Sequence, residues 1–247
     1  MKAYALSEIG KVRKDNEDSF LAFGDQGLFC VADGMGGYAG GQVASSIAIR
    51  VLEQEAPSLC VKSENQGEEP LNCGQKLKNA LQKANDQIFA QGRNGQYLGM
   101  GTTVTAALIR TGKLWIAHIG DSRAYLYREG QTSQLTQDHS LVNELLQQGE
   151  LTEEEAQHHP RRHVLTRALG VSASPEIDLL EVSIQNNDLL LLCTDGLYNQ
   201  LSFEEISGIL ALKDSLRAKV KKMIDLALER GGNDNITAVL VSICEDQ

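Results

Sequence analysis

Six short runs of almost unbroken apolar residues constrain the fold of this chain more than any other feature of its sequence. Such runs are typical of strands covered on both faces, because half-exposed strands alternate apolar and polar residues. Two intervening segments, Thr111-Gly112-Lys113 and Glu129-Gly130-Gln131, have the composition of hairpin turns and predict antiparallel pairing. The expected strands are LFCVA (28–32), VTAALI (104–109), LWIAHI (114–119), AYLYR (124–128), LLLLCT (189–194) and ITAVLVSI (236–243).

Helical stretches supply the cover for these strands. Separate blocks of hairpin-linked strands and helices predict an α+β fold, with helices packed outside the sheets. A short helix is expected from Phe203, because Ser202 can cap its first turn and Glu205 can complete a capping box. Three longer helices are predicted by apolar stripes at Val43, Ala44, Ile47, Ala48, Val51 and Leu52, at Leu77, Leu81, Ala84 and Ile88, and at Leu216, Val220, Met223, Ile224 and Ala227.

Two other segments are predicted to lie on the surface. Residues 57–75 are expected to form a polar loop between the first two helices, and residues 149–163 a charged, mobile excursion. Neither has the low complexity of a domain linker. The 247 residues suffice for one large domain or two small ones.

Composition excludes several classes of protein. The formal net charge of −10 repels nucleic acid and anionic lipid. No apolar run reaches the length of a membrane-spanning helix, and the first residues lack the apolar stretch of a signal peptide. The five cysteines are scattered and form no C-x-x-C pair, which argues against a disulfide framework and a structural zinc site. We therefore expect a protein of the reducing cytoplasm.

Acidic residues stand where the apolar runs begin or end. Three runs lead into Asp33-Gly34, Gly120-Asp121 and Asp195-Gly196, while Asp234-Asn235 precedes the last run. Each pair taken alone is typical of a turn. Strand ends lie at sheet edges, however, so these acids can converge, and converging carboxylates need a cation between them. Oxygen ligands favour Mg²⁺ or Mn²⁺, and a shared carboxylate is what a two-metal site requires.

A glycine cluster in the segment DGMGGYAGG (33–41) has a second possible interpretation. Residues 34–39 fit the dinucleotide-binding pattern G-x-G-x-x-A, with Glu53 about twenty residues further on. Against this, Asp33 would face a pyrophosphate with its negative charge. The simpler interpretation is that the glycines form a tight turn and let the following helix pack closely, which is compatible with either function.

Arg13 is a candidate phosphate ligand. It lies three residues before Asn16, so an extended segment could bring Arg13, Glu17 and Asp18 to one edge. A guanidinium binds a phosphate dianion through two parallel hydrogen bonds, which lysine cannot do. A solvated surface arginine is the alternative.

Eight motifs together resemble the PPM family, the metal-dependent serine/threonine protein phosphatases of the type 2C class. The resemblance covers residues 13–237 and is closest in form to bacterial members that consist of the catalytic domain alone. It implies a four-layer α-β-β-α sandwich of two antiparallel sheets covered by helices, as one domain over residues 1–247 with a flap at about 145–168. The motifs are R-x-x-N-E-D (13–18), D-G-M-G-G (33–37), G-T-T (101–103), G-D-S-R (120–123), D-H-S (138–140), L-T-R-A-L-G (165–170), T-D-G-L (194–197) and D-N-I-T (234–237).

The resemblance also implies a pair of metal ions, Mn²⁺ or Mg²⁺. Asp33 would bridge the two ions, and the backbone carbonyl of Gly34 would be a ligand of one of them. Asp195 and Asp234 would hold the other ion.

Further roles follow from the same resemblance. Glu17 and Asp18 would act largely through metal-bound waters. Asp121, together with Asp195, would contribute to a weaker third metal site. Arg13 would bind the substrate phosphate and act in catalysis with the metal-bridging aspartate.

The implied reaction is hydrolysis of phosphoserine and phosphothreonine monoesters in proteins by a metal-activated water at the two-metal carboxylate site. No cysteine has the C-x5-R arrangement of a thiolate nucleophile. The implied partners are phosphorylated proteins and a cognate serine/threonine kinase, in signalling, and the implied state is a monomer. One alternative function is a non-catalytic adaptor that keeps the fold, and it is disfavoured because every expected metal position has its acid. The other alternative is a dinucleotide-dependent enzyme.

The general acid is where the chain departs from the family pattern. Eukaryotic relatives have a histidine where this chain has Met35, and many bacterial relatives have one where it has Tyr38. A metal-bound water is the preferred proton donor, with His139 and His163 as other candidates. His159 and His163 have the spacing of a zinc pair on a helix, but the intervening Pro160 favours a solvated flap.

Overall fold

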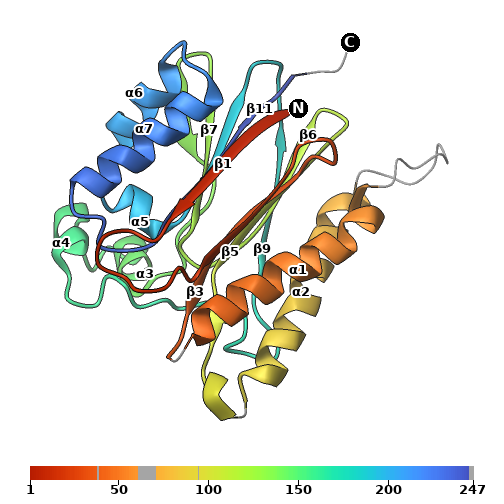
Figure 1. Ribbon diagram of the computed structural model, residues 1–247, viewed down its shortest axis with the longest axis vertical. Helices are drawn as coiled ribbons and strands as arrows, with labels where there is room; N and C mark the ends of the chain where they lie inside the picture. The colour runs from red at the N-terminus through yellow and green to blue at the C-terminus, as the bar shows by residue number, and fades with distance from the viewer. Residues whose placement is uncertain (38, 61–70, 94, 245–247) are drawn as a thin grey trace.

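The computed structural model describes residues 1–37, 39–60, 71–93 and 95–244, and its centre is a pair of antiparallel sheets (Figure 1). We call them sheet I and sheet II. Sheet I has the order β1 (Lys2–Glu8), β11 (Ile236–Ser242), β10 (Leu189–Cys193), β7 (Arg123–Arg128) and β8 (Gln131–Gln134). Sheet II has the order β2 (Asp18–Phe23), β3 (Leu28–Met35), β5 (Val104–Arg110), β6 (Lys113–Ile119) and β9 (Asp178–Ser183), with β4 (Gly101–Thr102) paired to β3.

Helices cover the outer face of each sheet. Two long helices, α1 (Gly40–Cys60) and α2 (Leu71–Gln91), pack on sheet II, while α6 (Phe203–Ala211) and α7 (Leu216–Glu229) pack on sheet I. None of the described helices combines the length and the apolarity needed to cross a membrane. The short elements are α3 (Leu141–Gln147), α4 (Glu153–His158), α5 (Asp195–Tyr198) and the 3-10 helix η1 (Gly95–Tyr97).

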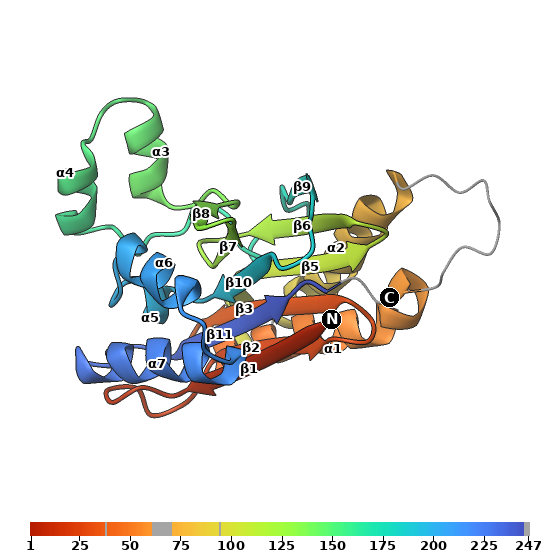
Figure 2. The same ribbon diagram turned by 90° about the horizontal axis from the view of Figure 1, so that it is seen from above.

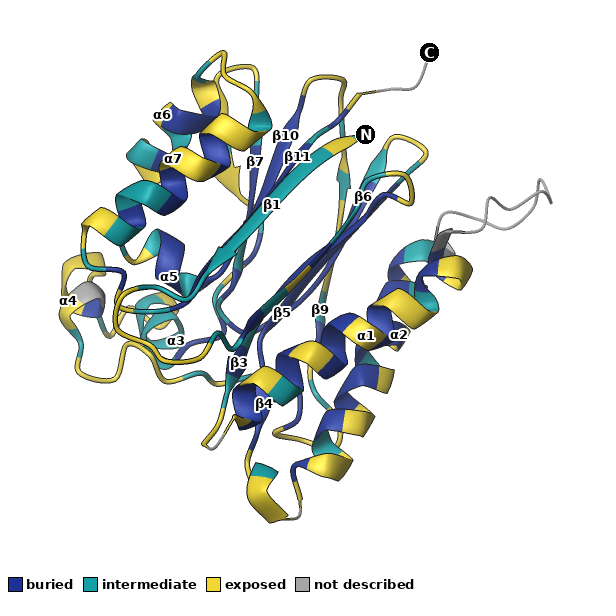
Figure 3. Ribbon diagram, in the orientation of Figure 1, coloured by how far each residue is buried: buried dark blue, intermediate teal, exposed yellow. Residues whose placement is uncertain are grey.

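Three apolar layers lie between these four layers of secondary structure. In β3, Cys30 points into the layer under α1 and α2, whereas Phe29 and Val31 point into the layer between the sheets. A third layer joins sheet I to α6 and α7. Figure 3 shows the buried residues along the central strands and on the inner faces of the helices. The predicted four-layer α-β-β-α sandwich is therefore confirmed.

The predicted hairpins and helix cap are also present. Thr111 and Gly112 have φ of 44° and 74°, and Glu129 and Gly130 have φ of 51° and 86°, as two-residue hairpin turns with left-handed backbone require. They join β5 to β6 and β7 to β8. At the start of α6, the predicted capping box between the serine and the glutamate three residues later is complete.

Some boundaries predicted from sequence were wrong. Residues 57–60 belong to α1, because Ala56 and Leu59 continue its apolar stripe past Pro57 into the core. Residues 71–75 form the first turns of α2. Residues 61–70 lie outside the described part of the chain. The excursion at 149–163 contains α4, whose first turn is closed by a capping box between Thr152 and Glu155. Strands β1, β2 and β9 were not predicted, since their apolar residues alternate with polar or small ones.

Candidate active site

Acidic residues from both sheets meet at one end of the sandwich. Asp33 lies near the end of β3 and pairs in register with Asp18, the first residue of β2. Sheet I contributes Asp195, two residues after β10, and Asp234, two residues before β11. Placing two aspartates opposite each other on neighbouring strands is unfavourable without a compensating charge. The predicted convergence of acids at the strand ends is therefore present.

The carboxylate of Asp18 is only half satisfied. The hydroxyls of Thr194 and Thr237 donate to its Oδ2, at 2.9 and 2.6 Å. Its Oδ1 is buried and has no hydrogen-bond partner among the described residues, and the same holds for Oδ1 of Asp195. A buried carboxylate oxygen without a partner costs free energy, so both atoms mark places where a positively charged ligand would be stabilising.

Burial and crowding raise the pKa of four aspartates at this end of the sandwich, Asp18, Asp33, Asp121 and Asp195. Burial raises the pKa of Asp33 well above its ordinary value, and the charges of Asp18, Asp195 and Asp121 raise it further. The pKa of Asp18 rises to about 7 and that of Asp195 to about 6, again first through burial and then through neighbouring carboxylates. For Asp121 the pKa rises to about 8, through burial and then Asp195. Divalent cations would reverse these shifts by favouring the ionised forms.

The donor set fits hard divalent cations. The converging side chains offer only carboxylate oxygens, which suit Mg²⁺ and Mn²⁺ better than softer metals. Asp33 and Asp195 are partly exposed, so ions can reach them from solvent. Among the described residues, no group of three acidic, histidine or cysteine side chains already forms a coordination shell. The fit rests on the partnerless oxygens and the concentrated negative charge.

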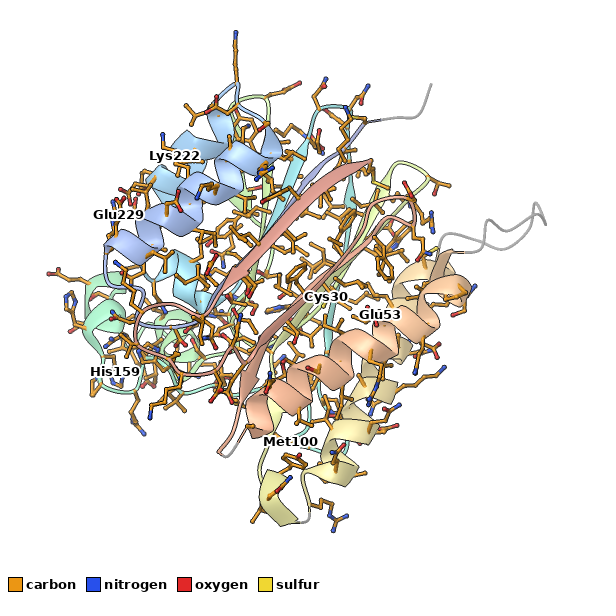
Figure 4. The ribbon with its side chains drawn as sticks, in the orientation of Figure 1. Cys30, Glu53, Met100, His159, Lys222 and Glu229 are labelled. Atoms are coloured by element: carbon orange, nitrogen blue, oxygen red, sulfur yellow. The ribbon has the colours of Figure 1, made fainter. Side chains whose placement is uncertain are left out.

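Glycines bring the backbone of β3 close to the start of α1. A Cβ atom on Gly41 would lie 2.7 Å from the carbonyl oxygen of Gly34 and 2.7 Å from Oε1 of Glu17. A Cβ atom on Gly34 would collide with the carbonyl oxygen of Gly41. The cluster therefore permits close packing of the helix, the second of the two interpretations. Glu53, the acid that a dinucleotide site would require, lies exposed on α1, where Figure 4 labels it.

The loop between β1 and β2 carries Arg13 to the acidic cluster. Its Nη2 donates to Oδ2 of Asp234 at 2.7 Å, and about half of the arginine side chain is exposed. Asn235 holds this loop in place: its Oδ1 accepts from the backbone of Glu17 at 2.8 Å, and its Nδ2 donates to the carbonyl of Asp15 at 3.0 Å. The predicted approach of Arg13 to the acids is present, with Asp234 as its partner.

Asp121 lies at the side of the cluster, after β6. Its backbone carbonyl accepts a hydrogen bond from the Tyr198 hydroxyl at 3.0 Å. The guanidinium carbon of Arg123 lies over the ring of Tyr198, 3.6 Å from the centre of that ring. Arg123 also forms an ion pair with Asp138. Polar side chains from two motifs, together with Tyr198 directly after a third, thus fix the turn that carries Asp121.

Comparison with known proteins identifies this arrangement. The family model described as protein phosphatase 2C matches residues 11–241. The chain belongs to the protein phosphatase 2C family. It is 41% identical over 248 residues to the serine/threonine phosphatase stp of Listeria welshimeri, covering 98% of this chain and 95% of that protein.

Solved structures support the same family. The serine/threonine phosphatase PstP/Ppp of Mycobacterium tuberculosis superposes with a TM-score of 0.88, at 38% identity over 99% of both chains. The catalytic domain of PstP in complex with two manganese ions superposes with a TM-score of 0.86, at 36% identity, covering 99% of this chain and 98% of that one. This chain is a metal-dependent protein serine/threonine phosphatase.

The sequence did not predict which uncharged side chains hydrogen bond to Asp18 and to the loop that carries Arg13. Thr194, Thr237 and Asn235 stand inside motifs that were recognised, yet no role was assigned to them. The signal available was their position, since each adjoins an acidic residue or lies within three residues of one. Their partners lie about 180 to 220 positions away, as with Asp18 and Thr237, so sequence spacing could not reveal the bonds.

The histidines proposed as proton donors lie outside the acidic cluster or at its margin. His139 is buried and hydrogen bonded through both ring nitrogens, to Gly120 and Asp178. His163 is largely exposed, and the partial desolvation of its ring and the charge of Arg162 lower its pKa. Tyr38 lies outside the described residues. The zinc pair is not supported, because α4 ends at His158, so His159 and His163 do not share a helix, and the Nδ1 atom of His159 accepts a hydrogen bond from the backbone N–H of Arg161.

The close approach of β3 and α1 predicts that the phosphatase tolerates no side chain at Gly41. In Gly41→Ala the new methyl group should collide with Gly34 and Glu17 and push both away from the start of α1. Because this displaces backbone of the site, Mn²⁺ binding and phosphatase activity should weaken by about tenfold or more. Gly37→Ala is the matched control, because no described atom lies within 4 Å of its Cβ position. Calorimetric Mn²⁺ titration and assays with an aryl phosphate would measure both. Equal behaviour of the two variants would contradict this account of the cluster.

The raised pKa values predict how pH affects the metal-free phosphatase. Unfolded aspartates release their protons near pH 4, whereas Asp18 and Asp121 keep theirs to about pH 7 and about pH 8. The folded protein therefore binds more protons than the unfolded chain over this window, so its stability falls as pH rises, by about 1.4 kcal/mol per pH unit for each proton. We expect Mn²⁺ to raise the melting temperature more at about pH 8 than at about pH 5.5, because cations bind the ionised carboxylates. Scanning calorimetry at matched ionic strength tests this, and an equal increase at both pH values would contradict it.

Proposed function

We propose that this phosphatase hydrolyses phosphoserine and phosphothreonine in proteins at the acidic end of the sandwich, using two divalent cations. One observation carries the proposal: carboxylates from both sheets converge there, and two of them, Asp18 and Asp195, have buried oxygens that find no partner in the described part of the chain. Such an arrangement is stable in ionised form only with cations present. When bound, the two cations would supply an activated water and neutralise charge on the phosphoryl group.

Each acidic residue has a proposed place around these cations. Asp33 would be shared by both ions, with the carbonyl of Gly34 binding one and Asp195 and Asp234 the other. Glu17 would bind through water. This assignment agrees with the register of β2 and β3 and with the position of both sheet I acids next to strand ends.

Two further aspartates would act beside the two cations. Asp18 would act through water, because two threonine hydroxyls already hold one of its oxygens. Asp121 would join Asp195 in a weaker third site, in keeping with the charge coupling of these two residues. The cofactors would thus be Mn²⁺ or Mg²⁺, two ions with a weaker third.

Arg13 would bind the substrate phosphate. The guanidinium carries five N–H donors, and the described hydrogen bond to Asp234 uses one of its nitrogens. A substrate phosphate would then lie beside the metal cluster, held by the arginine that also contacts a ligand of the metals. During hydrolysis, this guanidinium would stabilise negative charge on the phosphoryl oxygens.

The substrates would be phosphorylated proteins, and a serine/threonine kinase would be the opposing enzyme. The net charge of −10 disfavours binding to nucleic acid and to anionic membranes. The protein would act as a monomer in the cytoplasm. Residues 1–247 would form one catalytic domain, with a flap at about 145–168 that borders the active site; α4 lies within this range and projects from the sandwich together with α3 (Figure 2).

Substitution of the central aspartates tests the proposed function most simply. Asp33→Asn and Asp195→Asn keep the volume of the side chain and remove the charge that would hold the cations, so hydrolysis of a small aryl phosphate should fall by about 100-fold or more. Chelation of metal should have the same effect on the parent protein. Asp25→Asn, at the exposed turn between β2 and β3, is the matched control. Undiminished, chelator-resistant activity in either site variant would refute the proposed function.

The role of Arg13 has a separate test. Loss of a charged hydrogen bond to phosphate corresponds to about 1.5–3 kcal/mol, so Arg13→Ala should raise KM for a phosphopeptide by about tenfold or more. Arg13→Lys should recover little of this, because an ammonium group cannot form two parallel hydrogen bonds. Lys14→Ala is the control. If Mn²⁺ affinity fell in Arg13→Ala while KM stayed constant, Arg13 would serve Asp234 and not the substrate.

A further inference from the structure

A buried histidine connects the turn that carries Asp121 to the base of residues 141–164, the segment that contains α3 and α4 and that we call the α3–α4 excursion. The excursion leaves the sandwich at α3 and returns where Ser140 pairs with Leu165. His139 lies just before this point, and only 6% of it is exposed. It therefore occupies the junction between the catalytic end of the sandwich and the projecting helices that Figure 2 shows.

The backbone and the side chain of His139 both bind Gly120. The backbone N–H of His139 donates to the carbonyl of Gly120 at 2.7 Å, and the N–H of Gly120 donates to Nδ1 of the imidazole at 3.1 Å. Because a backbone N–H can only donate, Nδ1 carries no proton and Nε2 carries it. Gly120 directly precedes Asp121, so these two bonds fix the start of the turn that carries the carboxylate.

The other side of the imidazole reaches the return of the excursion. Its Nε2 donates to Oδ2 of Asp178 at 3.2 Å, and Oδ1 of the same carboxylate accepts from Arg167 at 3.3 Å. The backbone carbonyl of His139 accepts from Thr166 at 2.9 Å. Thr166 and Arg167 are the two residues after Leu165, so His139 contacts both the outgoing and the returning chain.

Neighbouring contacts make this connection rigid. The ring of His118, which is fully buried, lies 4.8 Å from that of His139. Its Nδ1 is hydrogen bonded to the hydroxyl of Thr105, and Thr105 donates to the carbonyl of Ser122, one residue after Asp121. Packed, hydrogen-bonded groups thus connect the base of the excursion to both ends of the turn.

We propose that His139 is a positioning residue that couples the α3–α4 excursion to Asp121. It holds the carboxylate of Asp121 where a weakly bound divalent cation can use it, and by reciprocity a cation there stabilises the docked excursion. This inference rests on the proposed function, because that function places Asp121 at a third metal site. The roles of the two tightly bound cations do not depend on it.

Hydrogen exchange of the metal-free protein tests the coupling itself. His139→Ala should speed exchange in the segments 119–123 and 141–164 together, by about fivefold or more for a coupling of 1–3 kcal/mol. His139→Asn should restore slow exchange at 119–123 only, because its Oδ1 can replace Nδ1 as acceptor while its amide falls short of Asp178. His158→Ala, at an exposed histidine within α4, should resemble the parent protein. Unchanged exchange in His139→Ala, or the same result for Ala and Asn, would overturn the proposal.

A second variant and a metal titration keep the test independent of folding defects at His139. Asp178→Ala leaves the histidine in place and removes its far partner, so it should speed exchange at 141–164 and weaken only the weaker Mn²⁺ binding event, by about fivefold or more. Parent-like exchange and metal binding in this variant would overturn the coupling. If the parent protein did not bind two Mn²⁺ ions tightly, the proposed function would be contradicted. Hydrogen exchange of the metal-free protein would still decide the role of His139.

Discussion

Repulsion between carboxylates is the interaction on which the rest of this structure depends. The register of β2 and β3 places Asp18 opposite Asp33, and sheet I adds Asp195 and Asp234 from the other side. Burial and mutual charge raise the pKa values of Asp18, Asp33 and Asp195, so the metal-free site is held together against its own electrostatics. The two-sheet core supplies the stability that makes such a site possible, because its strands are covered on both faces.

Neutral side chains hold the acids in place. Thr194 and Thr237 fix one oxygen of Asp18, and Asn235 fastens the loop that carries Arg13. On the opposite side, His139 fastens the turn of Asp121. The site therefore combines charged groups near strand ends with uncharged neighbours, of which Thr194, Thr237 and Asn235 lie far from their partners in the sequence.

The sequence predicted those parts of the fold that depend on local pattern. The runs in β3, β5, β6, β10 and β11 are apolar enough to identify a doubly covered sandwich, and the acids at their ends predicted the acidic cluster. The ends of α1 and α2 were missed because Pro57 and polar residues masked helical turns anchored by buried apolar side chains. The supporting contacts were missed because they join positions such as 18 and 237, which only the folded register brings together.

The most direct test of the central claim is an anomalous diffraction map from a crystal of this protein soaked in Mn²⁺. The account predicts two strong peaks between the sheets' acidic ends, both within coordination distance of Asp33, with Asp195 and Asp234 as ligands of one. A map without peaks at these aspartates, or with a single ion that Asp33 does not bind, would contradict it.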